Sequence, residues 1–256
     1  MQAQQRSTPA PPPTPPDGWQ VGAPDYVGVG TARSGTTWWD QLIVSHPDVK
    51  RMPSTPKEVH FFDAFWQREL DQADIARYHA YFARPEGKIS GEWTPGYMLD
   101  AWTPAALRQA APEARLLVLL RDPVERFRSG RTLAENRFTV GSTARAAANA
   151  AFNRGLYADQ LLRLWSAFPR ERTLVLQYES CVADTRAQLL RTFDFLGLEP
   201  EAADPDLARR FNASPGPKVV LDSWQEDVLA RRYAPENERL AILVPELDLS
   251  MWRAPS

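Results

Sequence analysis

The sequence predicts an α/β fold in which a central, mostly parallel sheet is flanked by helices. The apolar run within 115–120 and the similar, mostly apolar segment 173–178 are too short for ordinary helices and are typical of strands buried on both faces of a parallel sheet. Each run is followed by a helical pattern, and strands that alternate with helices indicate this fold class. A third strand is expected at 26–30, where a short apolar segment enters a glycine-rich turn.

The expected helices lie between and after these strands. Thr103 followed by Pro104 is a typical N-cap and first-turn pair, and Gly197 is a typical C-cap. The helices expected in chain order span about 36–45, a part of 68–83, 103–111, the segment from 124 onward and 185–196. Because ligands bind beyond the carboxyl ends of the strands in such sheets, the turns after 30 and after 120 form the candidate binding region.

The composition is that of a globular protein with an N-terminal extension. Of the 256 residues, 43% are hydrophobic and 24% are charged, which permits a real core and excludes wholesale disorder. Residues 1–18 are rich in proline and almost free of large apolar side chains, so they predict a flexible or polyproline-like arm. We therefore expect a single α/β domain over 19–256.

The same sequence argues against several function classes. No stretch approaches the roughly 18 apolar residues of a membrane span, and the N-terminus lacks a basic-then-apolar signal pattern. Cys181 is the single cysteine, which rules out an internal disulfide framework, and with only three histidines a metal site is not expected. Thirty basic and 32 acidic residues give a formal charge of −2, which argues against a general nucleic-acid binder. We expect a cytoplasmic enzyme or binding domain that uses no membrane, nucleic acid or metal, and its oligomeric state stays open.

The first candidate site is the segment 30–37, Gly-Thr-Ala-Arg-Ser-Gly-Thr-Thr, between a predicted strand and a predicted helix. Its glycines let backbone N–H groups turn inward and the helix N-terminus adds positive potential, so the segment suits a phosphate-like anion. The spacing of its glycines is that of a nucleoside triphosphate loop, which makes the expected fold P-loop-like. Thr36 and Thr37 stand where that loop requires lysine and a hydroxyl residue, and the cation is instead Arg33, which argues against an ATPase or kinase. A strand, turn and helix that bind no ligand are the alternative.

The second candidate site follows the apolar run at 115–120. Arg121 lies at the carboxyl end of that predicted strand, and Ser129 is expected about two turns along the next helix. A guanidinium and a hydroxyl together make a receptor for a second phosphate. Glu125 and Arg126 can instead form a solvated helical pair, and a solvated pairing is favoured for Arg128 as well.

The third candidate site is the segment 57–63, Lys-Glu-Val-His-Phe-Phe-Asp. Glu58 and His60 fall on one face if the segment is extended, because side chains alternate with period two. Two proton-transfer groups beside an anion site are what general-base chemistry on a hydroxyl requires. Taken alone, the Glu-x-His pair is more typical of an ordinary surface pair than of a catalytic site. Phe61 and Phe62 are expected in the core or in a pocket wall.

Together and in this order, the three motifs resemble the sulfotransferase family that uses 3′-phosphoadenosine 5′-phosphosulfate (PAPS). The resemblance points to the branch that includes heparan sulfate sulfotransferases and their bacterial relatives. It covers about residues 24–200, including a Gly-Glu-Trp-Thr-Pro-Gly-Tyr segment at 91–97 that is similar to the family's Glu-Lys-Thr/Ser-Pro-x-Tyr element. Further similarity lies at 157–162, 174–179 and 195–198.

The resemblance implies a role for each motif. PAPS would bind with its 5′-phosphosulfate in the loop and its 3′-phosphate on Arg121 and Ser129, and Glu58 would act as general base toward a hydroxyl or amine of the acceptor. His60 would orient the acceptor or replace Glu58 as base, and Arg33 with the loop amides would stabilise charge on the leaving phosphate oxygen. The scheme requires no metal. The loop residues that it assigns to the donor are Arg33, Ser34, Gly35, Thr36 and Thr37.

Two departures from the family pattern bear on this expectation. Arg33 stands where the family usually has the loop lysine, and Trp93 stands where the second element usually has another, so one expected cation near the sulfuryl group is missing. Two alternatives therefore stay open: a P-loop small-molecule kinase and a catalytically degenerate nucleotide-binding module. The expected acceptor is a small molecule, as in bacterial secondary metabolism, because the chain has no basic excess for a polyanion. Lys218 lies in a loop that either reaches the nucleotide or is simply solvated.

Overall fold

A four-stranded parallel sheet forms the centre of the computed structural model, which describes residues 9–135, 143–200 and 219–254. The strands lie in the order β2-β1-β3-β4, and every neighbouring pair is parallel. They span Tyr26–Gly30 (β1), Gly91–Trp93 (β2), Arg115–Leu120 (β3) and Thr173–Gln177 (β4). The parallel sheet predicted from the sequence is confirmed.

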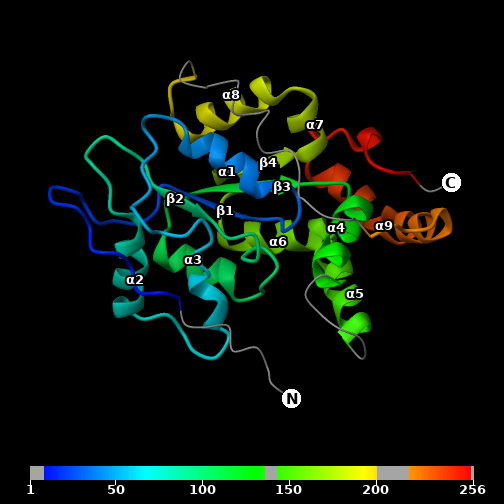
Figure 1. Cartoon of the computed structure of the whole chain (residues 1–256), viewed down its shortest axis with the longest axis horizontal. Coiled ribbons are helices and arrows are strands. Elements are labelled where there is room, and N and C mark those ends of the chain that lie inside the picture. The colour runs from blue at the N-terminus through cyan, green and yellow to red at the C-terminus, as the bar shows by residue number, and fades with distance from the viewer. Residues whose placement is uncertain (1–8, 136–142, 201–218, 255–256) are drawn as a thin grey trace.

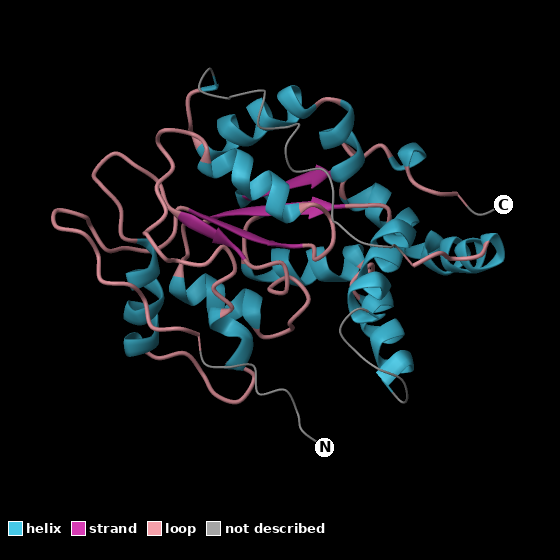
Figure 2. Ribbon diagram, viewed as in Figure 1, coloured by secondary structure: helices cyan, strands magenta, loops and turns pink. Residues whose placement is uncertain are grey.

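Helices cover both faces of this sheet (Figures 1 and 2). One face carries α1 (Thr36–Val44), α7 (Tyr178–Ala183) and α8 (Thr185–Leu196), and the other carries α3 (Thr103–Ala110) and α6 (Tyr157–Ala167). Beside α3 lies α2 (Gln72–His79). At the carboxyl end of the strands, α4 (Pro123–Glu135) contacts both α5 (Thr143–Asn153) and α9 (Ser223–Leu243).

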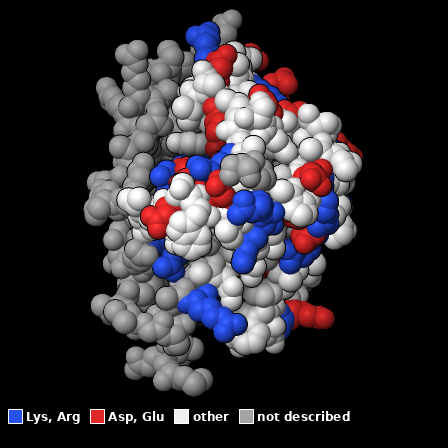
Figure 3. All heavy atoms as spheres, turned by 90° about the vertical axis from the view of Figure 1, so that its right-hand side faces the viewer, with Lys and Arg blue, Asp and Glu red and all other residues white. Residues whose placement is uncertain are grey.

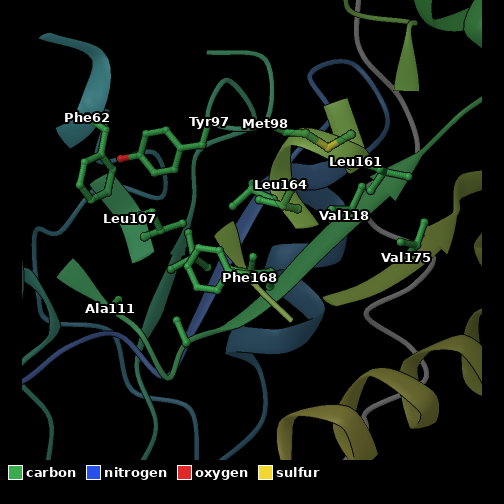
Figure 4. Close-up of a cluster of buried hydrophobic side chains, with 14 of the residues drawn as sticks. Phe62, Tyr97, Met98, Leu107, Ala111, Val118, Leu161, Leu164, Phe168 and Val175 are labelled. Carbon is green, nitrogen blue, oxygen red and sulfur yellow. The ribbon is translucent and has the colours of Figure 1, made fainter. Parts of the chain in front are cut away.

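Two apolar clusters fill the spaces between the sheet and its helix layers. Along β3, Leu116, Val118 and Leu120 face one cluster, whereas Leu117 and Leu119 face the other, as alternation along a strand requires. All five side chains are fully buried, because helices cover both faces of the strand. In Figure 4 the first cluster includes Met98, Leu107, Val118, Leu161, Leu164, Phe168 and Val175.

The observed boundaries match most of the predicted ones. β1, β3 and α8 begin and end where the sequence predicts, and Gly197 caps α8 with a φ of 71°, which glycine adopts readily. The N-cap of α3 is Trp102, so Thr103 is its first helical residue, and Tyr178 begins α7 instead of ending β4. β2 was not predicted from the sequence. Its three residues include the charged Glu92, so it lacks the apolar run that indicates a buried strand.

The N-terminal extension is described from residue 9 onward. The Tyr81 hydroxyl donates a hydrogen bond to the carbonyl oxygen of Ala10, and a β-bridge joins Gln20 to Arg84. The division into an arm at 1–18 and a domain at 19–256 stays a prediction. Among the described helices, none combines the length and the apolar character needed to cross a membrane.

Candidate active site

The candidate site lies where the parallel strands end. β1 is followed by the segment 31–35, β2 by 94–98, β3 by Arg121 and β4 by Tyr178, so neighbouring strands present their following residues at one edge. In Figure 1, β1 leads from this edge into α1 and β3 leads into α4. Ligands bind at this edge in open α/β sheets.

Hydroxyl groups form the hydrogen bonds that hold the loop after β1, and the loop leads directly into the start of α1. The hydroxyl oxygens of Thr31 and Ser34 lie 2.6 Å apart, and Thr31 Oγ1 donates to the carbonyl oxygen of Leu119 at 3.0 Å. Gly35, the N-cap of α1, supplies no capping side chain, and the first turn holds no acidic residue. The first N–H groups of a helix have no intrahelical partner, and the macrodipole is positive there. This helix start therefore suits a phosphate or sulfate group.

Gly35 is also the point where the loop packs against α7. Its φ is 87°, and a Cβ at this position would lie 2.8 Å from two carbons of the Tyr178 ring. Both the backbone conformation and the close ring require glycine here. The same ring carries the guanidinium of Arg121, whose Cζ lies 4.9 Å from the ring centroid. Tyr178 thus connects the loop to the second candidate site.

Arg33, Arg121 and Ser129 form one cluster. Arg121 Nη1 donates to the carbonyl oxygen of Arg33 at 3.3 Å, and Arg33 Nε donates to Ser129 Oγ at 3.1 Å. The two sites predicted separately at 30–37 and 121–129 are therefore continuous. Arg121 Nε is buried and has no hydrogen-bond partner in the described part of the chain, so this guanidinium retains a donor for an incoming anion.

Glu125 pairs with two of the arginines in this region. Its Oε2 accepts a hydrogen bond from Arg128 and lies 3.4 Å from Arg121 Nη2. Arg126, in contrast, is fully buried and donates to the carbonyl oxygen of Ala151. The solvated pair of Glu125 with Arg126 that the sequence allowed is wrong, because α4 turns Arg126 inward against α5. The pairing expected for Arg128 is present.

Glu58, His60 and Asp63 form a hydrogen-bonded chain. Glu58 Oε2 lies 3.2 Å from His60 Nε2, and Asp63 Oδ2 lies 3.1 Å from His60 Nδ1. The segment is not extended, because His60 has a φ of 55° and precedes the 3₁₀ turn η1 (Phe61–Ala64). The contact between Glu58 and His60 arises from this turn instead of from strand alternation. Phe61 and Phe62 are fully buried in the core, as expected.

The two carboxylates favour the charged form of His60. Hydrogen bonds to Asp63 and then to Glu58 outweigh partial burial and raise the pKa of His60 to about 9. Burial alone would raise the pKa of Glu58, but hydrogen bonds from His60 and Lys57, together with their charges, lower it below its ordinary value. At neutral pH the pair is therefore a histidinium and a carboxylate. A histidinium has no ring nitrogen left to accept a proton, whereas the Glu58 carboxylate has.

Lys57 joins this chain to the loop after β1. Its ammonium donates to Thr36 Oγ1 at 3.1 Å and to Thr37 Oγ1 at 3.4 Å, and it lies 3.2 Å from Glu58 Oε1. The side chain is only 16% exposed, and the carbonyl oxygen of Lys57 accepts a hydrogen bond from the N–H of Trp93 at 2.9 Å. Lys57 therefore bridges the start of α1 and the Glu58 carboxylate.

Glu92 of β2 anchors the segment that carries these groups. It is fully buried, and burial raises its pKa although four hydrogen bonds oppose that effect. Those bonds come from the N–H of Val59 at 3.0 Å and from the hydroxyls of Thr94 at 2.5 Å, Tyr78 at 2.8 Å and Tyr97 at 3.2 Å.

Thr94 and Tyr97 hold the next two residues of the same segment. Thr94 Oγ1 accepts from the N–H of His60 at 3.3 Å, and the Tyr97 hydroxyl accepts from the N–H of Phe61 at 2.8 Å. Three consecutive backbone N–H groups at 59–61 are thus bound by side chains of the 91–97 segment. These contacts fix the turn that places Glu58 and His60.

Trp93, where the family pattern has a lysine, is part of the core. Its side chain is fully buried, and its indole Nε1 donates to the carbonyl oxygen of Gly30 at 3.1 Å. A Cβ on Gly28 would lie 2.1 Å from the Trp93 ring, so glycine at 28 is what admits the indole against β1. Residue 93 therefore brings no charge to the site.

A segment near residue 252 packs behind Arg121. Glu179 accepts from the backbone N–H of Asp122 at 3.0 Å and from the indole N–H of Trp252 at 2.8 Å. The Asp122 carboxylate accepts from the N–H of Val124 at 2.8 Å, at the start of α4, and from the N–H of Arg253 at 2.9 Å. Burial raises the pKa of both carboxyl groups. Asp122, which lies between Arg121 and the start of α4, is thus tied to the last described residues.

Comparison with known proteins establishes the family. Residues 23–211 match the family described as Sulfotransferase domain. The chain belongs to the sulfotransferase family. Human heparan sulfate glucosamine 3-O-sulfotransferase 6 is 31% identical over 205 residues, which are 75% of this chain and 57% of that protein. Mouse heparan sulfate glucosamine 3-O-sulfotransferase 3A1 is 30% identical over 189 residues, 69% of this chain and 46% of that protein. The chain thus spans about half the length of these curated relatives.

Solved sulfotransferase structures share the fold. A sulfotransferase from Alicyclobacillus acidocaldarius superposes with a TM-score of 0.72 at 24% identity, covering 91% of this chain and 100% of that one. The sulfotransferase domain from the curacin biosynthetic pathway superposes with a TM-score of 0.58 at 14% identity, covering 92% of this chain and 100% of that one. The P-loop-like α/β fold expected from the sequence is confirmed.

Three further residues contact the predicted site segment, and the sequence alone did not indicate their roles. Lys57 stood inside a motif, and its position next to Glu58 is the only signal that points to it. Glu92 and Tyr97 stood in the 91–97 segment, but the N–H groups of Val59 and Phe61 that they bind lie more than 30 residues earlier in the chain. Lys218 lies outside the described residues. Where the structure is described, no three His, Cys, Asp or Glu side chains gather as a metal site requires.

Proposed function

We propose that this sulfotransferase moves the sulfuryl group of PAPS to a hydroxyl or amine of a small acceptor, with Glu58 as general base. The observation that carries the proposal is the position of the Glu58 carboxylate beside the start of α1. Lys57 links the two, at 3.2 Å from Glu58 Oε1 and 3.1 Å from Thr36 Oγ1. In-line transfer of an anionic group to a hydroxyl requires a base and an anion-binding site side by side.

The residues present fit the donor. The buried, unpartnered Nε of Arg121 and the hydroxyl of Ser129 suit a 3′-phosphate, and the uncapped start of α1 suits a 5′-phosphosulfate. Arg33 connects the two positions through its contacts to Arg121 and Ser129. When bound, PAPS supplies the sulfuryl group, and adenosine 3′,5′-bisphosphate is what leaves. The residues assigned to the phosphosulfate are Arg33, Ser34, Gly35, Thr36 and Thr37.

Glu58 has the protonation state that a base needs. Its lowered pKa keeps it ionised at neutral pH, and its side chain is 39% exposed, so an acceptor hydroxyl can reach it. His60 is charged under the same conditions and orients the carboxylate through Nε2. We therefore assign the base role to Glu58 and a positioning role to His60, in place of the alternative in which His60 takes the proton.

The charge of the chain supports a small acceptor. The curated relatives are named for heparan sulfate glucosamine, part of a polyanionic glycan. A polyanion is best attracted by a large basic surface. On the face drawn in Figure 3, Lys and Arg side chains lie among Asp and Glu, and the whole chain carries a formal charge of −2. A phenol, alcohol or amine of low charge is the acceptor class that fits this surface.

The test begins with the donor. Thermal unfolding is followed with adenosine 3′,5′-bisphosphate, with ADP and with ATP–magnesium. A ligand at about 100 times its Kd adds roughly 2.7 kcal/mol, which is several degrees for a domain of this size. We expect a rise with the bisphosphate and little with ADP. A rise with ATP–magnesium alone would replace the sulfotransferase proposal by a P-loop kinase.

The second stage tests the base. PAPS is incubated with a panel of phenols, alcohols and amines, and release of adenosine 3′,5′-bisphosphate is measured. General-base catalysis contributes roughly 10²–10⁴ in rate, so Glu58→Gln should lose about that much turnover and still bind the bisphosphate. The exposed Glu69→Gln is the matched control and should behave as wild type. Turnover of Glu58→Gln within a few-fold of wild type would exclude Glu58 as base. Bisphosphate binding without transfer to any acceptor would indicate a degenerate module.

A further inference from the structure

We propose that Lys57 is a catalytic residue that contacts the sulfuryl group of the bound donor. This inference rests on the proposed function and deepens it, because it names the cation that faces the group in transfer. Of the family's two lysine positions, one holds the buried, uncharged Trp93 and the other holds Arg33, whose Nε donates to Ser129, so neither provides an ammonium here.

The position of the ammonium carries the inference. An acceptor hydroxyl must lie within hydrogen-bond reach of Glu58 to lose its proton, and the leaving phosphate oxygen must lie at the start of α1. The sulfur atom lies between these two points during transfer. Lys57 Nζ is 3.2 Å from Glu58 Oε1 and 3.1 Å from Thr36 Oγ1, so the ammonium contacts groups at both ends of this interval.

The backbone and the burial of Lys57 keep the ammonium in this place. The N–H of Trp93 binds the carbonyl oxygen of Lys57 at 2.9 Å, and the next N–H groups along the segment are bound by Glu92 and Thr94. The side chain is 16% exposed, so its charge is only partly screened by solvent. A cation that is held before the donor arrives needs little reorganisation during the reaction, which is the condition for strong electrostatic stabilisation.

The neighbouring cations are directed elsewhere. Arg33 Nε donates to Ser129 Oγ at 3.1 Å, so this N–H is bound to α4. Arg51 forms a double hydrogen bond with Asp40, at 3.0 and 2.6 Å, and also donates to a backbone carbonyl oxygen. Lys57 is thus the cation that the described residues place between the base and the helix start.

The chemical step balances without a proton from Lys57. The acceptor oxygen forms a bond to sulfur while the bond between sulfur and the bridging phosphate oxygen breaks. The acceptor proton passes to the Glu58 carboxylate, and the electron pair of the broken bond stays on the leaving bisphosphate. Lys57 keeps its proton throughout and offsets the negative charge on the sulfuryl oxygens and the leaving oxygen.

The experiment compares two ligands that differ only in the sulfuryl group. Isothermal titration measures PAPS and adenosine 3′,5′-bisphosphate on wild type, Lys57→Met and Lys57→Arg. Lys88→Met is the matched control, because Lys88 is a surface lysine paired with Asp48. A hydrogen bond to a charged group is strong enough that Lys57→Met should lose about 10-fold or more in PAPS affinity, with the bisphosphate changed by less than about 3-fold. Lys57→Arg should recover most of the lost PAPS affinity.

Two results overturn the proposal and leave the proposed function standing. One is wild-type PAPS affinity in Lys57→Met, and the other is an equal loss for PAPS and the bisphosphate, which would give Lys57 a purely structural role. If Lys57→Met does not fold, Lys57→Gln provides the same comparison. A wild-type protein that binds neither ligand refutes the proposed function and this inference together, so the two failures are distinguishable.

Discussion

Asp63→Asn should move the titration of His60 toward that of an ordinary histidine. The hydrogen bond between Asp63 Oδ2 and His60 Nδ1, 3.1 Å long, is the largest of the influences that raise the pKa of His60 to about 9. Asparagine keeps the shape and one acceptor oxygen but removes the charge. A nearby opposite charge changes a pKa by about 1–3 pH units, so we expect the pKa of His60 to fall by about 1–2 units while Glu58 still holds it above 6.5.

The same change should alter how stability depends on pH. A raised pKa means that the folded protein binds more protons than the unfolded chain between pH 6.5 and about 9. The stabilisation is therefore complete below pH 6.5 and is lost as the pH rises through about 9. Because the His60 side chain is 44% exposed, screening reduces this contribution to on the order of 1 kcal/mol. In Asp63→Asn this pH dependence should become clearly smaller, because the folded and unfolded pKa values of His60 lie closer together.

Two assays follow the effect. The imidazole resonances of His60 can be titrated by NMR, since the chain has only three histidines and the variants His46→Gln and His79→Gln identify the other two. Urea unfolding at pH 6 and pH 9.5 gives the stability difference for wild type and Asp63→Asn. A His60 pKa that stays near 9 in the variant would refute the role given to Asp63. So would a stability difference between the two pH values that is the same in both proteins.

The remaining predictions concern Glu92, which anchors the segment 57–63, and the proposed second phosphate site at Arg121. Glu92→Gln replaces an acceptor of four hydrogen bonds by a group that also donates, so at least one buried hydroxyl or N–H loses its partner. We expect a loss of about 1–3 kcal/mol and a Tm several degrees lower, and an unchanged Tm in calorimetry would contradict the anchoring role. Arg121→Ala should weaken adenosine 3′,5′-bisphosphate binding about 10-fold or more and change ADP binding little. Equal effects on both nucleotides in a titration would place the 3′-phosphate elsewhere.

The parts of the fold that were predictable are those whose cause is local in sequence. The run from Arg115 to Leu120 is a strand because each residue after the first is apolar and both faces are covered. Gly197 ends α8 because its positive φ is available to glycine at little cost. β2 was not predictable, because a glycine, a charged residue and a tryptophan do not form the apolar run that indicates a buried strand. The last two of these residues are buried only because Tyr78, Tyr97 and Gly28 surround them in space.

The site divides in the same way. Glu58, His60 and Asp63 lie within six residues, so a motif can name them, although the turn at His60 and not strand alternation brings them together. The position of Lys57 in the site depends on its contact with Thr36, 21 residues earlier. No spacing rule connects these two residues, so the contact could not be predicted from the sequence. Arg126 shows the reverse case, since its neighbours in sequence suggested a surface pair while packing against Ala151 buries it.

The contacts of Asp122 and Glu179 with Arg253 and Trp252 have a consequence for synthesis on the ribosome. Asp122 accepts from the N–H of Val124 at the start of α4, and Glu179 lies in α7. Both carboxylates use partners that leave the exit tunnel last among the described residues. A nascent chain that already contains the loop after β1 and all four strands therefore lacks one hydrogen-bond partner of each of these two carboxylates. The loop after β1 and its contact with Arg121 can form during translation, whereas the contacts of Asp122 and Glu179 are completed only after residue 253 has emerged.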